Sequence, residues 1–155
     1  MNASAPEQID LNSPDSKRGH EQLLSYWSDL RGERKFPKEN EINTDALSAL
    51  WSDCFLLNCS ESNGQYKYDF MGPALIEAYG MDMTGLTHDH DEEFNIQSVL
   101  DSFQKVISSG EQMIDESEFT NKQGMKVKYR CCLVPFGEAP EKVNYILGLM
   151  RWKFE

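Results

Sequence analysis

The sequence predicts an α+β fold in which a five-stranded antiparallel sheet carries helices on one face and is preceded by an amphipathic helix. Two short apolar runs joined by an Asn-Gly turn come first, and three strand-like runs close the chain after a helical segment. A stretch of helical periodicity precedes them all. With 155 residues, of which 39% are hydrophobic, the chain suits one domain with a single core.

The charge balance excludes several classes of protein. Acidic residues outnumber basic ones 26 to 15, and the formal net charge of −11 repels phosphate backbones and anionic lipid headgroups. No apolar run approaches the roughly 20 residues that a membrane helix needs, and the polar start lacks the apolar stretch of a signal peptide. We therefore expect a cytoplasmic protein with no membrane span that does not bind nucleic acid.

The N-terminal third divides into a tail and a helical lead. Residues 1–18 are mostly polar, so we expect a disordered tail there. Within a lead spanning 19–52, the spacing of Leu23, Leu24, Trp27 and Leu30 predicts an amphipathic helix over 19–31 whose apolar face covers another element. Asn43 is suited to cap a second, short helix, whose face is formed by Ala46, Leu47, Leu50 and Trp51.

The main domain is expected over residues 53–155. The runs 54–59 and 66–71 predict a hairpin around the turn Asn63-Gly64. Pro73 favours the first turn of a helix that continues to Tyr79-Gly80. A longer helix carries Phe94 near its start and ends at Gly110, and it buries a stripe formed by Val99, Phe103 and Val106.

Three strands are predicted at the end of the chain. Residues 113–120 pair with 125–131, where Met125, Val127, Tyr129 and Cys131 face the core and the intervening basic residues face water. The basic residues Lys126, Lys128 and Arg130 are expected to pair with Glu116 and Glu118 across the hairpin. The last strand, 143–154, is apolar on both faces, which is typical of a central strand covered on both sides. The helix over 19–31 is the natural second cover.

This order of elements resembles the PAS domain, and most closely the small stand-alone bacterial PAS proteins with a helical N-terminal lead. The resemblance depends on an ordered set of short segments between about Gly19 and Phe154. These are Leu24-Ser25-Tyr26-Trp27, Leu30-Arg31-Gly32, Phe55-Leu56-Leu57, Tyr66 to Gly72, Leu75, Tyr79-Gly80, Asp82, Thr84-Gly85, Leu133-Val134-Pro135-Phe136 and Ile146-Leu147-Gly148.

The resemblance implies a sensory or protein-interaction module in bacterial signalling, usually without catalysis of its own. PAS pockets bind haem, flavin, small acids or nothing, so the resemblance does not identify a cofactor. PAS domains that form a photochemical flavin adduct carry a cysteine in the helical segment, and none lies between Pro73 and Gly110. No output region follows Phe154, so we expect the signal to pass through a partner protein or a homodimer.

Two sets of residues are candidates for binding. A ligand pocket between sheet and helices is predicted from aromatic and aliphatic residues, with Tyr66, Tyr68 and Phe70 on one strand face; a filled core would use the same residues. Its lining is Tyr68, Phe70, Leu75, Tyr79, Val99, Phe103 and Tyr129. An interaction helix is predicted to cover the outer sheet face or to join two subunits through Leu23, Leu24, Tyr26, Trp27 and Leu30.

Other chemical features have plainer interpretations. Cys54, Cys59, Cys131 and Cys132 are expected to be buried, reduced and unreactive. The cluster around His88 and His90 fits the charged start of a helix better than a metal site. The alternative function is a cone-shaped α+β isomerase or cyclase with a buried acid–base pair. That enzyme needs a carboxylate that faces inward, deep in the cavity, and Asp69 and Asp115 are the carboxylates to check for such a position.

Overall fold

The computed structural model describes residues 14–60, 66–86, 95–138 and 142–155. Five antiparallel strands form one sheet in the order β2-β1-β5-β4-β3. The strands are β1 (Cys54–Asn58), β2 (Lys67–Met71), β3 (Met113–Thr120), β4 (Lys126–Phe136) and β5 (Tyr145–Phe154). The two opening strands and the three closing strands therefore meet in a single sheet, which confirms the predicted fold class.

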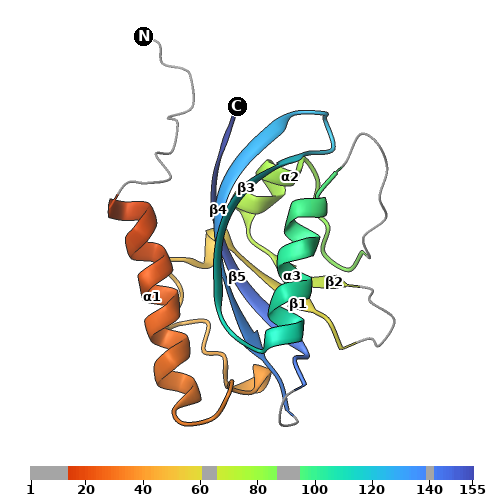
Figure 1. Cartoon of the computed structure of the whole chain (residues 1–155). Helices are drawn as coiled ribbons and strands as arrows, with labels where there is room; N and C mark the ends of the chain where they lie inside the picture. The colour runs from red at the N-terminus through yellow and green to blue at the C-terminus, as the bar shows by residue number, and fades with distance from the viewer. Residues whose placement is uncertain (1–13, 61–65, 87–94, 139–141) are drawn as a thin grey trace.

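Three helices cover the two faces of this sheet. In Figure 1, α1 (Pro14–Arg31) lies on one side, and α3 (Gln97–Ser109) lies on the other. The short α2 (Pro73–Tyr79) also packs on β5, and its buried residues are Leu75, Ala78 and Tyr79. We call the face toward α1 the outer face and the face toward α3 the inner face.

Strand β5 is central, as its apolar sequence predicts. It pairs with β1 on one side and with β4 on the other, and the residues from Ile146 to Met150 are buried. Gly148 lies opposite Phe55, and a methyl group at position 148 would overlap the Phe55 ring. A residue without a side chain is therefore required where this aromatic ring crosses the central strand.

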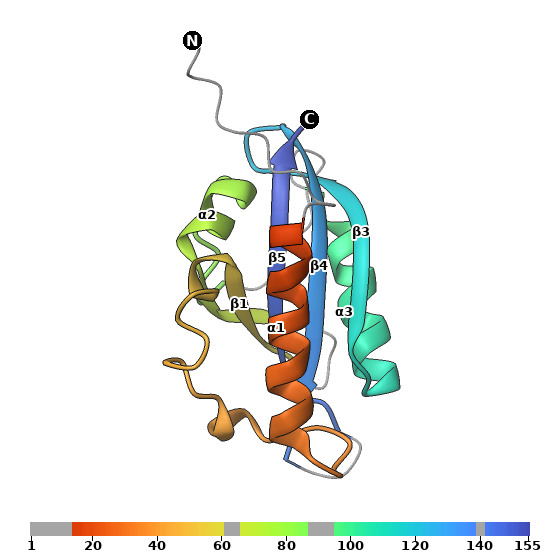
Figure 2. The same cartoon turned by 90° about the vertical axis from the view of Figure 1, so that its left-hand side faces the viewer.

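Helix α1 is the predicted second cover. Figure 2 shows it in front of β4 and β5, with the chain from residue 32 to 53 beside it. Leu23 and Trp27 are buried against the sheet, and the Trp27 indole N–H donates a 2.8 Å hydrogen bond to the Pro135 carbonyl oxygen. The helix begins at Pro14, so residues 14–18 belong to it and not to the tail; residues 1–13 lie outside the described part.

The second helix of the lead does not form. Five N–H groups between Ala46 and Trp51 bond to carbonyls three residues earlier, and within residues 43–53 only Trp51–Asp53 forms a short 3-10 helix. Asn43 still accepts the Asp45 N–H at 2.9 Å, and Leu47 and Leu50 are buried. Burial of two side chains thus needs only tight turns, because the segment is too short to gain from a regular helix.

The β3–β4 hairpin follows the predicted register with two exceptions. Val127, Tyr129 and Cys131 are buried, and Arg130 and Lys126 pair with Glu116 and Glu118. Lys128, predicted to pair with these glutamates, pairs with Glu155 instead. Met125 is exposed, because it lies before β4 in the turn, where its N–H donates to the Asn121 side chain. The prediction that Met125 faces the core is therefore wrong.

The inner helices end as predicted. Gly80 and Gly110 adopt left-handed conformations directly after α2 and α3. Val99, Phe103 and Val106 form the buried stripe of α3. Phe94, predicted to belong to this helix, lies outside the described residues.

The Gly148→Ala variant tests the crossing of β1 and β5. We expect it to lower the free energy of unfolding by about 3 kcal/mol, because the added methyl group displaces a buried ring. Gly32→Ala is the matched control: its backbone φ is +59° and nothing lies near the added atom, so backbone strain alone costs about 1 kcal/mol. Urea denaturation measures both values, and equal losses would contradict the proposed overlap.

Candidate functional site

An aromatic cluster fills the space between the inner face and the two inner helices. Tyr68 is its centre: its ring contacts Phe55, Tyr79 and Phe103 at centroid distances of 5.5, 5.8 and 6.5 Å. The cluster continues from Tyr79 through Phe119 to Tyr129. Of the predicted lining residues, Tyr68, Tyr79, Phe103 and Tyr129 belong to this cluster, and Leu75 of α2 and Val99 of α3 are buried.

Hydroxyl groups give this interior its polarity. The Tyr68 and Tyr79 hydroxyls share a 2.6 Å hydrogen bond, and the Tyr129 hydroxyl donates to Ser98 Oγ of α3 at 3.0 Å. Burial raises the pKa of Tyr129 to about 12 and raises the pKa values of Tyr68 and Tyr79 as well. All three therefore stay neutral and act as hydrogen-bond donors and acceptors, not as anions.

Phe70 is the predicted lining residue that does not join the cluster. The pairing of β1 with β2 is irregular between Leu56 and Leu57, so that Phe70 lies opposite Leu56 while Tyr68 lies opposite Leu57. The extra residue in β2 turns Phe70 to the face away from Tyr68. There its ring stacks on Trp51 with the centroids 4.6 Å apart.

Tyr66 lies at the rim of the cluster. Its ring meets that of Phe103 edge to face, with the centroids 5.9 Å apart, and its hydroxyl donates to the Gln104 side chain at 2.6 Å. The described side chains thus pack against one another as in a filled core. A ligand that entered this interior would have to displace one of these contacts.

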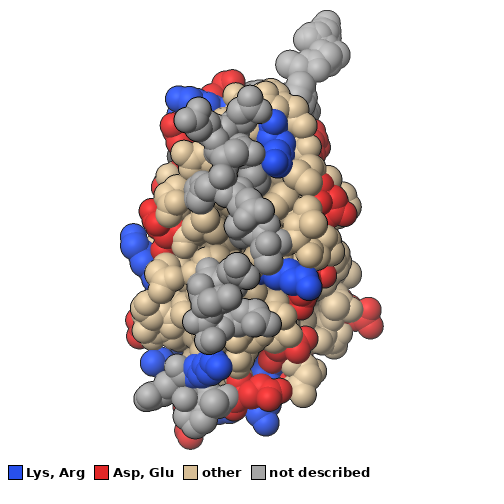
Figure 3. All heavy atoms as spheres, turned by 90° about the vertical axis from the view of Figure 1, so that its right-hand side faces the viewer, with Lys and Arg blue, Asp and Glu red and all other residues tan. Residues whose placement is uncertain are grey.

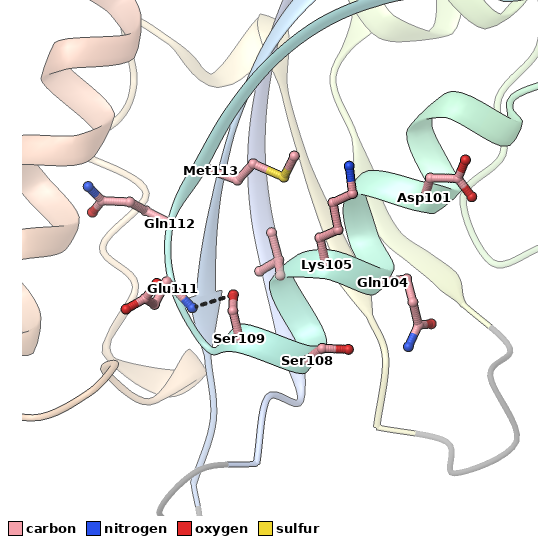
Figure 4. Close-up of a pocket in the computed structure, with 9 residues that line it drawn as sticks. Asp101, Gln104, Lys105, Ser108, Ser109, Glu111, Gln112 and Met113 are labelled. Atoms are coloured by element: carbon pink, nitrogen blue, oxygen red, sulfur yellow. Dashed lines mark hydrogen bonds between the residues drawn. The ribbon is translucent and has the colours of Figure 1, made fainter.

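A surface groove runs along the outside of α3. It has a volume of about 760 Å³ and lies between the helix and the start of β3. In Figure 4, the side chains of Met113 and Lys105 lie on opposite sides of the space between the strand and the helix, and the Glu111 N–H donates to Ser109 Oγ. Acidic and basic side chains are interspersed on the face shown in Figure 3, so no single sign of charge dominates that view.

The predicted interaction helix covers the outer face. Leu23 and Trp27 are buried and Leu24 and Leu30 are partly buried against the core. The Tyr26 hydroxyl accepts the N–H of Asn43 at 2.8 Å and so ties the helix to the segment that follows it. Of the two roles predicted for these residues, the packing matches the covering of the sheet.

The four cysteines are free and buried. Burial raises the pKa of the Cys54, Cys59 and Cys132 thiols to about 12 and raises the pKa of the Cys131 thiol further. Cys132 lies under α1, where its sulfur is 4.0 Å from the His20 carbonyl oxygen. Such thiols are poor nucleophiles, because the reactive species is the thiolate.

The carboxylates of the alternative enzyme do not form a buried acid–base pair. Asp69 is exposed, and the Asn58 side-chain amide donates a long, 3.5 Å hydrogen bond to its carboxylate. Asp115 is partly buried at the edge strand and accepts a 2.8 Å hydrogen bond from Ser102 Oγ. His88 and His90 lie outside the described residues, and the described part holds no group of three metal-ligating side chains.

Comparison with known proteins gives one family and many similar folds. A family model described as "PAS domain" matches residues 16–151. No curated protein matches. A light-oxygen-voltage domain studied with a flavin analogue has a TM-score of 0.54 at 13% identity, covering 70% of this chain and 82% of that one.

Two further solved structures have the same fold. The dark structure of the blue-light photoreceptor Aureochrome1 LOV has a TM-score of 0.52 at 11% identity, with coverage of 70% and 80%. The RsLOV d2 variant has a TM-score of 0.50 at 15% identity, with coverage of 68% of this chain and 64% of that one. At these identities the likeness concerns the fold. No helix in the described residues is long and apolar enough to cross a membrane.

The raised thiol pKa values predict a loss of stability at alkaline pH. Below about pH 9 both folded and unfolded chains keep their thiol protons, and between about 9 and 12 only the unfolded chain loses them. The free energy of unfolding should therefore fall with rising pH in this window, by on the order of 1 kcal/mol per thiol and pH unit. Denaturation at several pH values measures the slope, and Cys59→Ala should reduce it; a flat profile would contradict the burial.

A double-mutant cycle tests the hydrogen bond between Tyr68 and Tyr79. We expect Tyr68→Phe and Tyr79→Phe each to destabilise the fold, with a coupling energy of about 1 kcal/mol between them. The same cycle between Tyr68→Phe and Tyr66→Phe should give a coupling near zero, because the Tyr66 hydroxyl bonds to Gln104. A zero coupling in both cycles would exclude a direct bond between the two buried hydroxyls.

Proposed function

Because the chain belongs to the PAS domain family, we propose that it is a sensory and protein-interaction module of bacterial intracellular signalling, without catalysis of its own. It acts in the cytoplasm, binds a partner protein and takes a small ligand between the sheet and the inner helices. The helical lead, which begins at Pro14, and the core from residue 53 to 155 act as one unit, since the family model spans both.

The observation that supports this function best is the double contact of β4. Its Tyr129 faces inward and bonds to Ser98 of α3, whereas its Cys132 and the Pro135 carbonyl contact α1 on the outer face. One strand thus touches the candidate ligand site and the helix on the opposite face. If ligand binding displaced α3, the hydrogen bond from Tyr129 would move β4, and the contacts of β4 with Trp27 and His20 would move α1.

The aromatic interior determines the kind of ligand that we propose. Its rings can stack on a flat molecule, and its neutral hydroxyls can donate to carbonyl or carboxylate oxygens. A flavin analogue appears in the description of one similar structure, and flavin is one such flat molecule. A covalent flavin adduct is not part of the proposal, because no cysteine lies between Pro73 and Gly110.

We propose that the partner protein binds differently to the chain when α1 is docked and when it is not. The exposed face of α1 is polar and includes Glu21, Gln22, Ser25, Ser28 and Asp29. Leu23 and Trp27 are buried while the helix is docked, so a homodimer through these residues would require α1 to leave the sheet. A change in docking therefore changes which surface, polar or apolar, the partner meets.

Native mass spectrometry and an absorption spectrum of the purified protein test the ligand. We expect a retained small molecule, and Tyr79→Phe should lower its occupancy by about threefold or more, because one interior hydroxyl is lost. Tyr66→Phe is the matched control, since that hydroxyl bonds at the rim. Removal of the ligand by unfolding and refolding should speed amide exchange in α1.

Two outcomes would count against this function. If the purified protein carries no small molecule, the proposal that it binds a ligand in the aromatic interior is wrong. Unchanged exchange in α1 after removal of a bound molecule would show that β4 does not couple the two faces.

A further inference from the structure

A hollow distinct from the groove along α3, and separate from the aromatic interior, lies where the end of α1 meets the turn between α3 and β3. Its volume is about 340 Å³, and it is lined by Trp27, Arg31, Lys35, Gly110, Glu111 and Gln112. We propose that this hollow binds the oxyanion of a small molecule, a phosphate or carboxylate group, through Arg31 and Lys35. The proposal goes beyond the sensory function above and uses none of the residues of the aromatic interior.

Trp27 holds the Arg31 guanidinium in place. The guanidinium carbon lies 5.0 Å from the centre of the Trp27 ring, a cation–π distance. Trp27 is itself fixed, because it is 2% exposed and its indole N–H bonds to Pro135. An arginine oriented in this way has less conformational freedom to lose when it binds an anion.

Arg31 has N–H donors that the described part of the chain does not use. Its Nη1 donates to the Arg34 carbonyl oxygen at 3.1 Å, while its Nε is shielded from solvent and has no hydrogen-bond partner in the described part. A guanidinium has five N–H donors, and a shielded donor without an acceptor costs free energy. An oxyanion that reached the guanidinium would supply acceptors of the geometry that arginine prefers.

Lys35 contributes the second positive charge. Its side chain crosses Gly110: an added Cβ at that glycine would lie 2.7 Å from Lys35 Cε and 3.2 Å from Nζ. The ammonium therefore lies at the C-terminal end of α3, close to the other wall of the hollow. Part of its charge offsets the carbonyl dipoles at that helix end.

The charges of the hollow favour an anion. Among the residues that the structure describes, neither Arg31 nor Lys35 forms an ion pair, whereas the nearby Arg34 pairs with Glu41 at 2.9 Å. Glu111 is the one acidic residue in the lining, so cations outnumber carboxylates two to one. Gln112 adds an amide that can donate to the same oxyanion.

An anion in this hollow would connect the two layers of the fold. Arg31 belongs to α1 on the outer face, and Gly110 to Gln112 join α3 of the inner layer to β3. A ligand bound to both would oppose the departure of α1 from the sheet. The proposed site is thus a place where a small anionic molecule stabilises the docked state.

Titration with inorganic phosphate, and separately with acetate, at constant ionic strength tests the site by NMR. We expect saturable shifts of the Gly110 and Gln112 amides and of the Trp27 indole N–H, and about tenfold weaker binding in Arg31→Met and in Lys35→Met. Lys105→Met is the matched control, because it removes the same charge from the neighbouring groove and should leave the affinity unchanged. Saturation by phosphate alone identifies a phosphate ligand, and saturation by acetate alone a carboxylate.

Shifts that grow without saturation, or affinities that fall equally in all three variants, would overturn the proposal. Lys35 is exposed, so we expect Lys35→Met to stay folded. It therefore still tests anion binding if Arg31→Met unfolds. The amide spectrum of each variant checks its fold. Failure here leaves the ligand of the aromatic interior unaffected, since native mass spectrometry tests that site through Tyr79.

Discussion

The fold depends on the need to cover β4 and β5 on both faces. These strands are buried over most of their length, and a sheet face that is apolar must be packed against another layer. The helices α2 and α3 cover the inner face, and α1 must cover the outer one. The hydrogen bond from Trp27 to Pro135 satisfies a buried indole N–H at this contact, so α1 has a single favoured position on the sheet.

The sequence predicted the parts of the fold that depend on strong periodicity. The alternation in Val127, Tyr129 and Cys131 placed these three residues inward, and the apolar run from Ile146 to Met150 placed β5 at the centre. Both patterns reflect burial, which tertiary structure enforces over a whole strand. Helix ends marked by glycine, such as Gly110, were predictable for a different, local reason, because glycine adopts the left-handed conformation at little cost.

Two of the errors fall where one residue more or less changes the outcome. Nothing in the alternation of Tyr66, Tyr68 and Phe70 indicates that β2 carries an extra residue, which turns Phe70 onto Trp51. Met125 lies one residue outside β4, because the Asn121 side chain holds its N–H in the turn. A bulge and a turn boundary each depend on pairing with a partner strand, which a single segment does not reveal.

The candidate sites differ in how far sequence could identify them. Six of the seven predicted lining residues are buried, and four of them meet in the aromatic cluster, because each lies on the buried face of its own element. No sequence pattern marked Arg31 and Lys35 as a site. Arg31 is the last residue of α1 and Lys35 lies four residues later, and only the fold brings both of them to Gly110. Sites made of exposed residues from distant segments depend on topology, and periodicity carries no information about them.

The two proposed sites act on the same structural variable, the docking of α1, from different sides. Through Tyr129 and the strand it belongs to, the interior can shift the sheet under the helix, whereas an anion beside Arg31 would bind the end of the helix itself. Each ligand can change the docking equilibrium only by the difference in its affinity for the docked and undocked states. If both bind the docked state more tightly, linkage requires that each increases the affinity for the other. If the two ligands prefer different states, each lowers the affinity for the other. The sign of this coupling therefore determines whether the two ligands act together or against each other on the docking of α1.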